Sequence, residues 1–217
     1  MDRSGPADAG ADQAARLIAT RRSWHGVAEL VMAGPQYRRS GSIKLRVVPG
    51  GFSTVAEPDL RVDAAELVAG DRRHLLTGVT YAGLAAVVGV TVGAPADVYH
   101  DGSGLEPADQ ADVDPAAARY LAACFVSGDA ALRLFAPACE PVLWPEHFDV
   151  ATDLDEVTYG VSLGDAEIAG PYAYVAPWAR PAGRFWNASF GAAHPLGQPS
   201  RAELIAEFFQ AGRSAAG

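Results

Sequence analysis

The chain has 217 residues and a formal net charge of −9, with 17 Lys and Arg residues against 26 Asp and Glu residues. A chain of this length fits one domain and buries about 70% of its unfolded surface, so it needs neither disulfides nor a structural metal to fold. Nucleic-acid binding requires a basic face, and docking on an anionic membrane does too. We therefore expect a soluble protein that binds neither nucleic acid nor membrane.

Several features indicate a cytoplasmic bacterial protein. The N-terminal residues MDRSGP lack the apolar segment of a signal peptide, and no apolar run reaches membrane-spanning length. The two cysteines, Cys124 and Cys139, are too few for a disulfide framework and lack the spacing of a metal site. Lys44 is the single lysine in a chain rich in Ala, Gly, Asp and Val, which is typical of a high-GC bacterium.

Helical spacing predicts three main helices, near residues 14–34, 115–136 and 200–212. We expect Gly34-Pro35 to end the first helix, and Asp114 to cap the second. Thr80 is expected to cap a short helix between them. Residues 1–12 and 214–217 are expected to be tails on a single domain that spans residues 13–213.

Alternation of apolar and polar residues predicts strands in two regions, 42–76 and 140–190. Ile43, Leu45 and Val47 alternate with polar residues, and Pro49-Gly50-Gly51 follows as a turn. No internal repeat is visible in the sequence. The fold class that we expect is α+β, a twisted and mostly antiparallel sheet packed by the three main helices.

His147 and Asp149 form the first candidate site. In a strand that begins near Val142, alternation places both side chains on one face. Such a pair can act as an oriented base or as two metal ligands. With His194 further along the chain it also matches the ligand pattern of non-haem iron oxygenases, where Arg201 would anchor a co-substrate carboxylate. The pattern is short, and a structural His–Asp pair is the competing interpretation.

The segment Gly160–Gly164 has the spacing of a serine nucleophile elbow, which requires a strand that turns sharply into a helix. The residues that follow it reach Pro171 before a helix can form. We therefore interpret the segment as a strand that ends in a glycine turn. Asp165, directly after Gly164, joins His147 and Asp149 as a candidate catalytic residue.

Large aromatic residues gather in the C-terminal third of the chain. Tyr172 and Tyr174 alternate with small residues, so both phenols are expected to point to one side. Aromatic residues near a few polar groups describe a ligand pocket, although they also fill cores. The candidate ligand-binding residues are Trp144, His147, Tyr159, Tyr172, Tyr174 and Asn187.

Three segments carry a resemblance to a known family: LWPEHFDVA from Leu143, YGVSLGD from Tyr159 and PYAYV from Pro171. They resemble a bacterial, actinobacterial-type domain of unknown function with the signature WPxHFD … GxSxGDxxI … PYxYV. The layout of residues 20–180 is similar as well, although Ala169-Gly170 replaces the usual proline–acid pair. The resemblance implies no reaction, cofactor or catalytic residue.

Three classes of function remain open on these patterns. The first is a small-molecule-binding or accessory protein with an aromatic pocket on the C-terminal strands. The second is a metal-dependent enzyme, oxygenase-like or hydrolytic, that uses His147 and Asp149 with His194. The third is an interaction protein without a pocket. The patterns predict neither a particular cofactor nor an oligomeric state.

Overall fold

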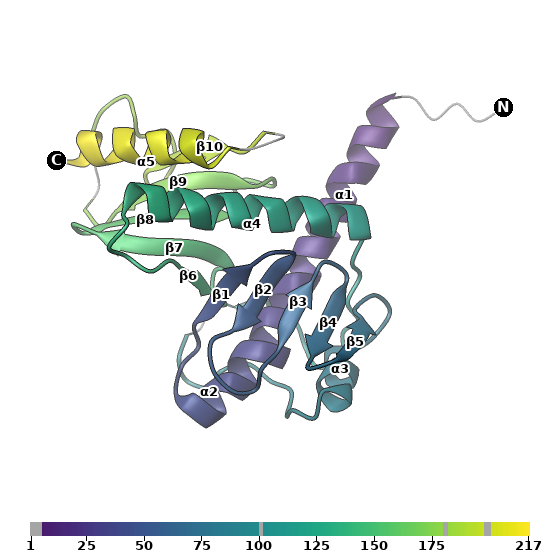
Figure 1. The fold of residues 1–217 in the computed structure, drawn as a ribbon. Helices are drawn as coiled ribbons and strands as arrows, with labels where there is room; N and C mark the ends of the chain where they lie inside the picture. The colour runs from purple at the N-terminus through teal and green to yellow at the C-terminus, as the bar shows by residue number, and fades with distance from the viewer. Residues whose placement is uncertain (1–5, 100–101, 180–181, 198–200) are drawn as a thin grey trace.

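A computed structural model of the chain describes residues 6–99, 102–179, 182–197 and 201–217. Within these residues the strands form a single ten-stranded sheet, in the order β10-β9-β8-β7-β6-β1-β2-β3-β4-β5 (Figure 1). Every neighbouring pair of strands is antiparallel. The α+β prediction, with a mostly antiparallel sheet, is therefore confirmed.

The sheet consists of two meanders of five strands each. The first contains β1 (Leu45–Val48), β2 (Gly51–Thr54), β3 (Arg61–Asp63), β4 (Glu66–Ala69) and β5 (Arg72–Leu75). The second contains β6 (Val142–Trp144), β7 (Asp149–Leu154), β8 (Val157–Ser162), β9 (Tyr172–Pro177) and β10 (Ala192–Pro195). Strands β1–β9 lie within the two regions where alternation predicts strands, whereas β10 lies just beyond the second region.

The two meanders join at the centre of the sheet, where Leu45 of β1 lies opposite Leu143 of β6. Read outward from this central pair, the strand order is the same in both directions. Each meander also follows a long helical segment in the chain. The two halves thus share one order of strands, although no repeat is visible in the sequence.

The first helical segment is longer than expected at both ends. It contains α1 (Pro6–Gly26), the π-helix η1 (Val27–Ala33) and α2 (Gly34–Ser40). The expectation that Gly34-Pro35 ends the helix is wrong, because Pro35 lies in the first turn of α2, where its missing N–H is tolerated. Helix α1 begins inside the segment that was expected to be a tail.

The remaining helices are α3 (Tyr81–Val87), α4 (Pro115–Phe135) and α5 (Ala202–Ala216). The Thr80 hydroxyl accepts from the Gly83 N–H, and Asp114 accepts from the N–H groups of Ala116 and Ala117, so both predicted caps are confirmed. Helix α5 extends through residues 214–216, where a tail was expected. Ser200, the expected start of this helix, lies outside the described residues.

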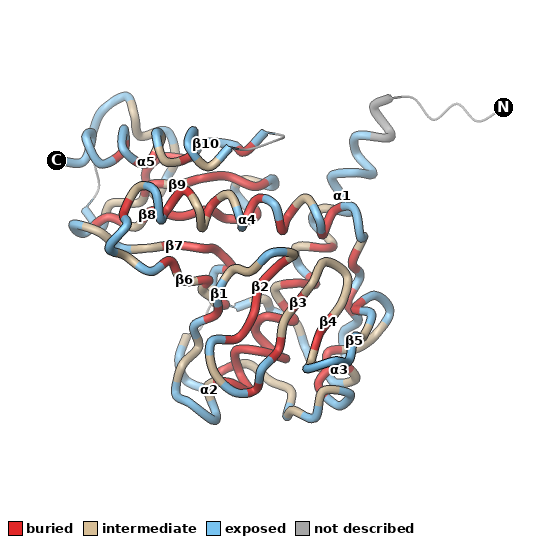
Figure 2. The backbone as a smooth tube through the Cα atoms, viewed as in Figure 1, coloured by how far each residue is buried: buried red, intermediate tan, exposed pale blue. Residues whose placement is uncertain are grey.

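Helices α4 and α5 pack on one face of the second meander, as Figure 1 shows. Gly128 of α4 allows this close approach, because a Cβ at this position would lie 2.7 Å from Cβ of Val161. Val150, Val161 and Val175 are fully buried on this face, and Figure 2 shows the burial along β7–β9 and α4. Residues 10–16 of α1, in contrast, are exposed.

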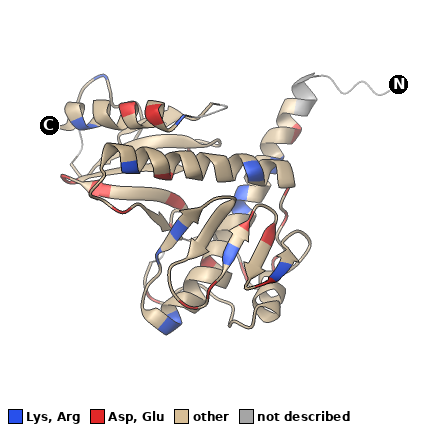
Figure 3. Cartoon of the chain, viewed as in Figure 1, with Lys and Arg blue, Asp and Glu red and all other residues tan. Residues whose placement is uncertain are grey.

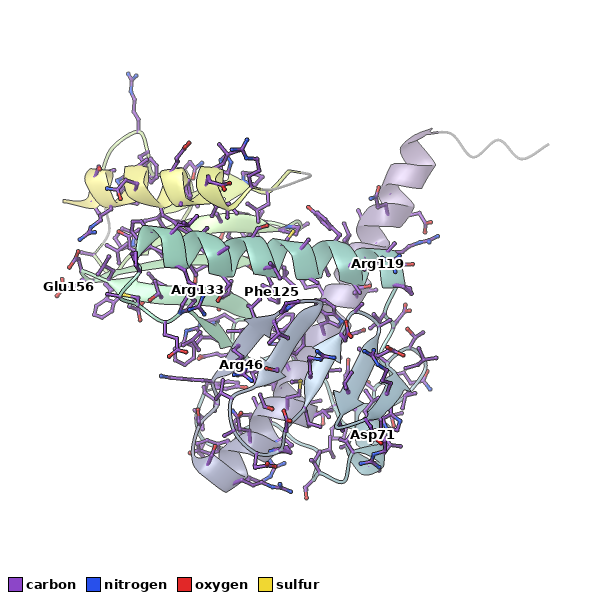
Figure 4. All side chains as sticks on the ribbon, viewed as in Figure 1. Arg46, Asp71, Arg119, Phe125, Arg133 and Glu156 are labelled. Carbon is purple, nitrogen blue, oxygen red and sulfur yellow. The ribbon has the colours of Figure 1, made fainter. Side chains whose placement is uncertain are left out.

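Phe148 lies where the two halves of the molecule meet. Its ring is 5.4 Å from the ring of Phe52 on β2 and 5.4 Å from that of Phe125 on α4, measured between centroids, and it stacks on His25 at 5.2 Å. Figure 4 shows Phe125 between α4 and the strands β1 and β2. One side chain thus connects α1, α4 and both meanders.

Neither cysteine is bridged in the structure: Cys124 is a buried free thiol, and Cys139 is free and half-buried. None of the helices in the described part of the chain combines the length and hydropathy needed to cross a membrane.

Truncation of Phe148 tests its role at this junction. We expect Phe148→Ala to lower the free energy of unfolding by about 3–5 kcal/mol, because it removes a buried ring that three aromatic neighbours contact. Leu134→Ala is the control, since Leu134 is 58% exposed and should change stability by less than about 0.5 kcal/mol. Urea denaturation measures both values. A Phe148 effect as small as the control would contradict the role.

Candidate functional site

The structure places His147 and Asp149 in different local environments. Trp144 pairs with Asp149, so His147 lies in the turn between β6 and β7 and Asp149 begins β7. Phe148 has a φ of 52°, which turns the chain between them. The expectation that both side chains share a strand face is therefore wrong. The His147 side chain is 65% exposed, whereas Asp149 is 5% exposed.

Asp149 makes a hydrogen bond with a tyrosine. Its Oδ2 accepts from the hydroxyl of Tyr174 on β9, while its Oδ1 is buried and has no hydrogen-bond partner among the described residues. Gly160, on the strand between them, makes room for this contact, because a Cβ there would lie 2.6 Å from the Tyr174 ring. A buried polar atom without a partner is rare in folded proteins and requires an explanation.

A second carboxylate–tyrosine pair lies beside the first. The Tyr172 hydroxyl donates to Oδ2 of Asp165, and Oδ1 of Asp165 accepts from two backbone N–H groups at 2.7 Å each. The Tyr172 and Tyr174 ring centroids are 6.2 Å apart, and Phe190 lies within 6.2 Å of both. The two phenols thus lie on the same side of β9, the side that faces away from α4 and α5.

The two carboxyl groups differ in their titration. Burial raises the pKa of Asp149 to about 6, although the Tyr174 hydrogen bond and the charge of His147 lower it. The pKa of Asp165 is lowered from its ordinary value. Burial alone would raise it, but the hydrogen bonds from Tyr172 and the backbone to the charged carboxylate outweigh burial. Asp149 therefore exchanges its proton near neutral pH, whereas Asp165 is held as a carboxylate that braces its loop.

The aromatic candidates do not form one pocket. Tyr159 is fully buried on the opposite face of the sheet, where it packs against Phe135 and Phe209 as part of the core. Trp144 is on the same face as Asp149 and carries the Lys44 ammonium 5.8 Å from its ring centroid.

Asn187 also has a structural role, because its side-chain amide hydrogen-bonds to both the N–H and the carbonyl of Ala193 and holds the start of β10.

Four cavities of about 410, 410, 480 and 530 Å³ are lined by described residues. Tyr172 and Tyr174 line none of these four cavities. These two tyrosines pack against each other and against Phe190.

The structure does not bring His194 together with His147 and Asp149. His194 lies on β10, three strands from β7, which corresponds to about 14 Å at the usual strand spacing. It also points to the opposite face, where its ring is 5.4 Å from Phe208 of α5. Arg201, the proposed anchor, pairs with Glu203. Among the described residues no three His, Cys, Asp or Glu side chains cluster as metal ligands.

Sequence reasoning missed a buried carboxylate, Glu29, which lies on the π-helix η1 and is 4% exposed. Its Oε2 accepts from the N–H of Ser103 at 2.9 Å and from the Ser103 hydroxyl. One signal was present, because Glu29 is the single charged residue in the otherwise apolar run Val27–Ala33.

The pH dependence of stability tests the environment of Asp149. Because its folded pKa is raised from 3.8 to about 6, the stability that its proton contributes is complete below about pH 4 and is lost as the pH rises through about 6. Over this interval we expect the wild type to lose up to about 3 kcal/mol relative to Asp149→Asn. Urea denaturation at several pH values measures the free energy of unfolding of both proteins. Asp71→Asn, on the exposed β4–β5 turn labelled in Figure 4, should keep the wild-type slope.

Removal of the Tyr174 hydroxyl should shift the same titration. The hydrogen bond that Tyr174 donates favours the ionised carboxylate, so we expect Tyr174→Phe to raise the pKa of Asp149 further above 6. Carbon-13 NMR of the aspartate side-chain carboxyl groups follows the titration of Asp149 directly. Tyr172→Phe is the matched control, because its hydroxyl bonds Asp165 instead. Equal shifts of the Asp149 resonance in both variants would contradict the assignment.

Comparison with known proteins adds no functional information about this site. No family model, curated protein or solved structure matches the chain. The resemblance to the WPxHFD family therefore stays a prediction, and the function has to be inferred from the geometry of the chain itself.

Proposed function

We propose that the protein binds a small polar molecule at Asp149 and Tyr174, on the face of the second meander that helices leave uncovered. The observation that carries this proposal is the buried Oδ1 of Asp149, which lacks a hydrogen-bond partner among the described residues. Leaving a buried acceptor unsatisfied costs about 1–3 kcal/mol, so a donor that reaches it gains about that much.

The surroundings of Asp149 limit the size and chemistry of such a ligand. Tyr172, Tyr174 and Phe190 pack closely against one another, so the ligand has to be small. It has to donate a hydrogen bond, because an ionised carboxylate only accepts. His147 is exposed to solvent on the adjoining turn. Its charge lowers the pKa of the Asp149 carboxyl group.

One observation favours a second function, acid–base catalysis on the bound molecule. The pKa of Asp149 is raised by burial to about 6, and a group that titrates near neutral pH both accepts and donates protons efficiently. Acid–base catalysis by Asp149 does not require His194 as a metal ligand. It predicts that wild-type protein converts the bound molecule and that Asp149→Asn, which cannot exchange the proton, does not.

Native mass spectrometry tests the binding function. We expect wild-type protein purified at pH 7 to retain an added mass, or else to gain thermal stability with a panel of small amides, amines and alcohols. Asp149→Ala should lose this response, because the acceptor is gone.

Asp71→Ala is the control, since it removes an exposed carboxyl group on the distant β4–β5 turn and should respond as the wild type does. The proposal is overturned if Asp149→Ala keeps the response. It is also overturned if the wild type neither retains a mass nor is stabilised by any member of the panel.

A further inference from the structure

The ten-stranded sheet ends in two edge strands, β10 in the second meander and β5 in the first (Figure 1). The outward side of an edge strand presents backbone N–H and C=O groups with which another chain can pair. Proteins commonly block such edges against unwanted pairing, with prolines, charges or a covering group. The two edges of this sheet differ in this respect.

The β10 edge is blocked by Asn187 and Pro195. The Leu196 N–H donates to the Pro171 carbonyl at 2.8 Å. This bond sets the alternation of hydrogen bonds between β9 and β10, so Ala193 and Pro195 direct their backbone groups outward. The side-chain amide of Asn187 accepts from the Ala193 N–H at 2.8 Å and donates to its carbonyl at 3.1 Å. Because proline has no N–H, an incoming strand finds no free donor on these two residues.

The β5 edge carries no comparable block among the described residues. The Leu76 N–H donates to the Ala65 carbonyl at 2.9 Å. By the same alternation His74 bonds to β4, whereas Arg73 and Leu75 direct their N–H and C=O groups away from the sheet. Their backbone groups take part in no other hydrogen bond among the described residues, and Leu75 is 67% exposed.

A second copy of β5 fits this edge best in one register. Antiparallel pairing about a twofold axis at His74 places Arg73 opposite Leu75 of the second copy, so that the outward groups of both strands bond to each other. An axis at Arg73 would place two guanidinium groups opposite each other, which destabilises a strand pair. An axis at Leu75 would place Arg73 opposite Thr77, which lies beyond the end of β5.

The register centred on His74 also matches the charges on the uncovered face of the first meander. Two rows of side chains cross β3, β4 and β5 on this face, an acidic row that ends at Leu75 and a basic row that ends at Arg73. The rows are Asp63–Glu66–Leu75 and Arg61–Val68–Arg73. In the paired copies the acidic row of one is in line with the basic row of the other. The exposed Leu75 then packs against the aliphatic part of the facing Arg73.

We propose that the β5 edge is an interface at which a second copy of this chain adds to the sheet, antiparallel and centred on His74. The two sheets then form one continuous sheet across the twofold axis. A contact made by one short strand from each copy buries little surface, so the dimer is reversible and not permanent. The inference is independent of the Asp149 site, which lies on β7 in the other meander.

Sedimentation equilibrium of the full chain over a range of protein concentrations tests the proposal, and we expect a reversible dimer. Leu75→Pro removes an outward N–H but no bond to β4, so it should fold, and the dimer should weaken at least about tenfold because both copies lose a hydrogen bond. Leu75→Arg, which keeps the backbone, should also weaken the dimer by placing like charges opposite each other. Leu134→Arg, the same change at an exposed position on α4, should dimerise as the wild type does.

Cysteine cross-linking tests the register, in a chain in which the half-buried Cys139 is replaced by Ser. His74→Cys should form a disulfide between copies under mild oxidation, because the two Cα atoms at the axis lie about 4.5 Å apart. Arg72→Cys is the matched control on the same face of β5, since its Cα atoms lie more than about 12 Å apart in this register.

Four results would overturn the proposal. The first is a wild type that stays monomeric at every concentration, and the second is a monomeric wild type that binds a glutamate-rich peptide at β5 instead. The third is wild-type dimerisation in both Leu75→Pro and Leu75→Arg. The fourth is cross-linking of Arg72→Cys as readily as His74→Cys.

Discussion

The packing of Phe148 is the interaction on which the rest of the structure depends. The two meanders share one strand pair, β1 with β6, in which a single residue pair is in register. A contact this short requires side chains to hold the halves together, and Phe148 does so through Phe52, Phe125 and His25. The left-handed backbone of Phe148 points the ring into this junction and places Asp149 at the start of β7.

Three carboxyl groups illustrate how environment, not residue type, decides chemical behaviour. For Asp165, hydrogen bonds to the charged form outweigh burial, and the pKa is lowered. For Asp149, burial outweighs its hydrogen bonds and the charge of His147, and the pKa is raised. Glu29 is as buried as Asp149 but lies in a cavity with neutral donors. For Asp149 and Asp165, the donors that reach the carboxyl group, set against its burial, decide the direction in which the pKa moves.

The two meanders share a topology but present different surfaces on the face that helices leave uncovered. In the first meander this face carries ion pairs, in which Arg73 binds Asp63 and Glu66 and Arg61 approaches Asp63. Figure 3 shows charged residues of both signs on the strands of this half. In the second meander the same face carries Tyr172 and Tyr174 with their carboxylate partners. The uncovered faces of the two halves thus differ, with exposed ion pairs on the first meander and tyrosine–carboxylate pairs on the second.

Local patterns in the sequence were sufficient to predict the fold class and the approximate positions of the main helices and strands. The caps at Thr80 and Asp114 and the alternation in both strand regions act over a few residues, so they were readable without tertiary contacts. Tertiary structure alone decided that β1 pairs with β6, that His194 faces away from Asp149, and that Glu29 accepts a hydrogen bond from Ser103, 74 residues along the chain. These outcomes depend on contacts between residues distant in the chain, and no short-range periodicity records which distant segments will meet.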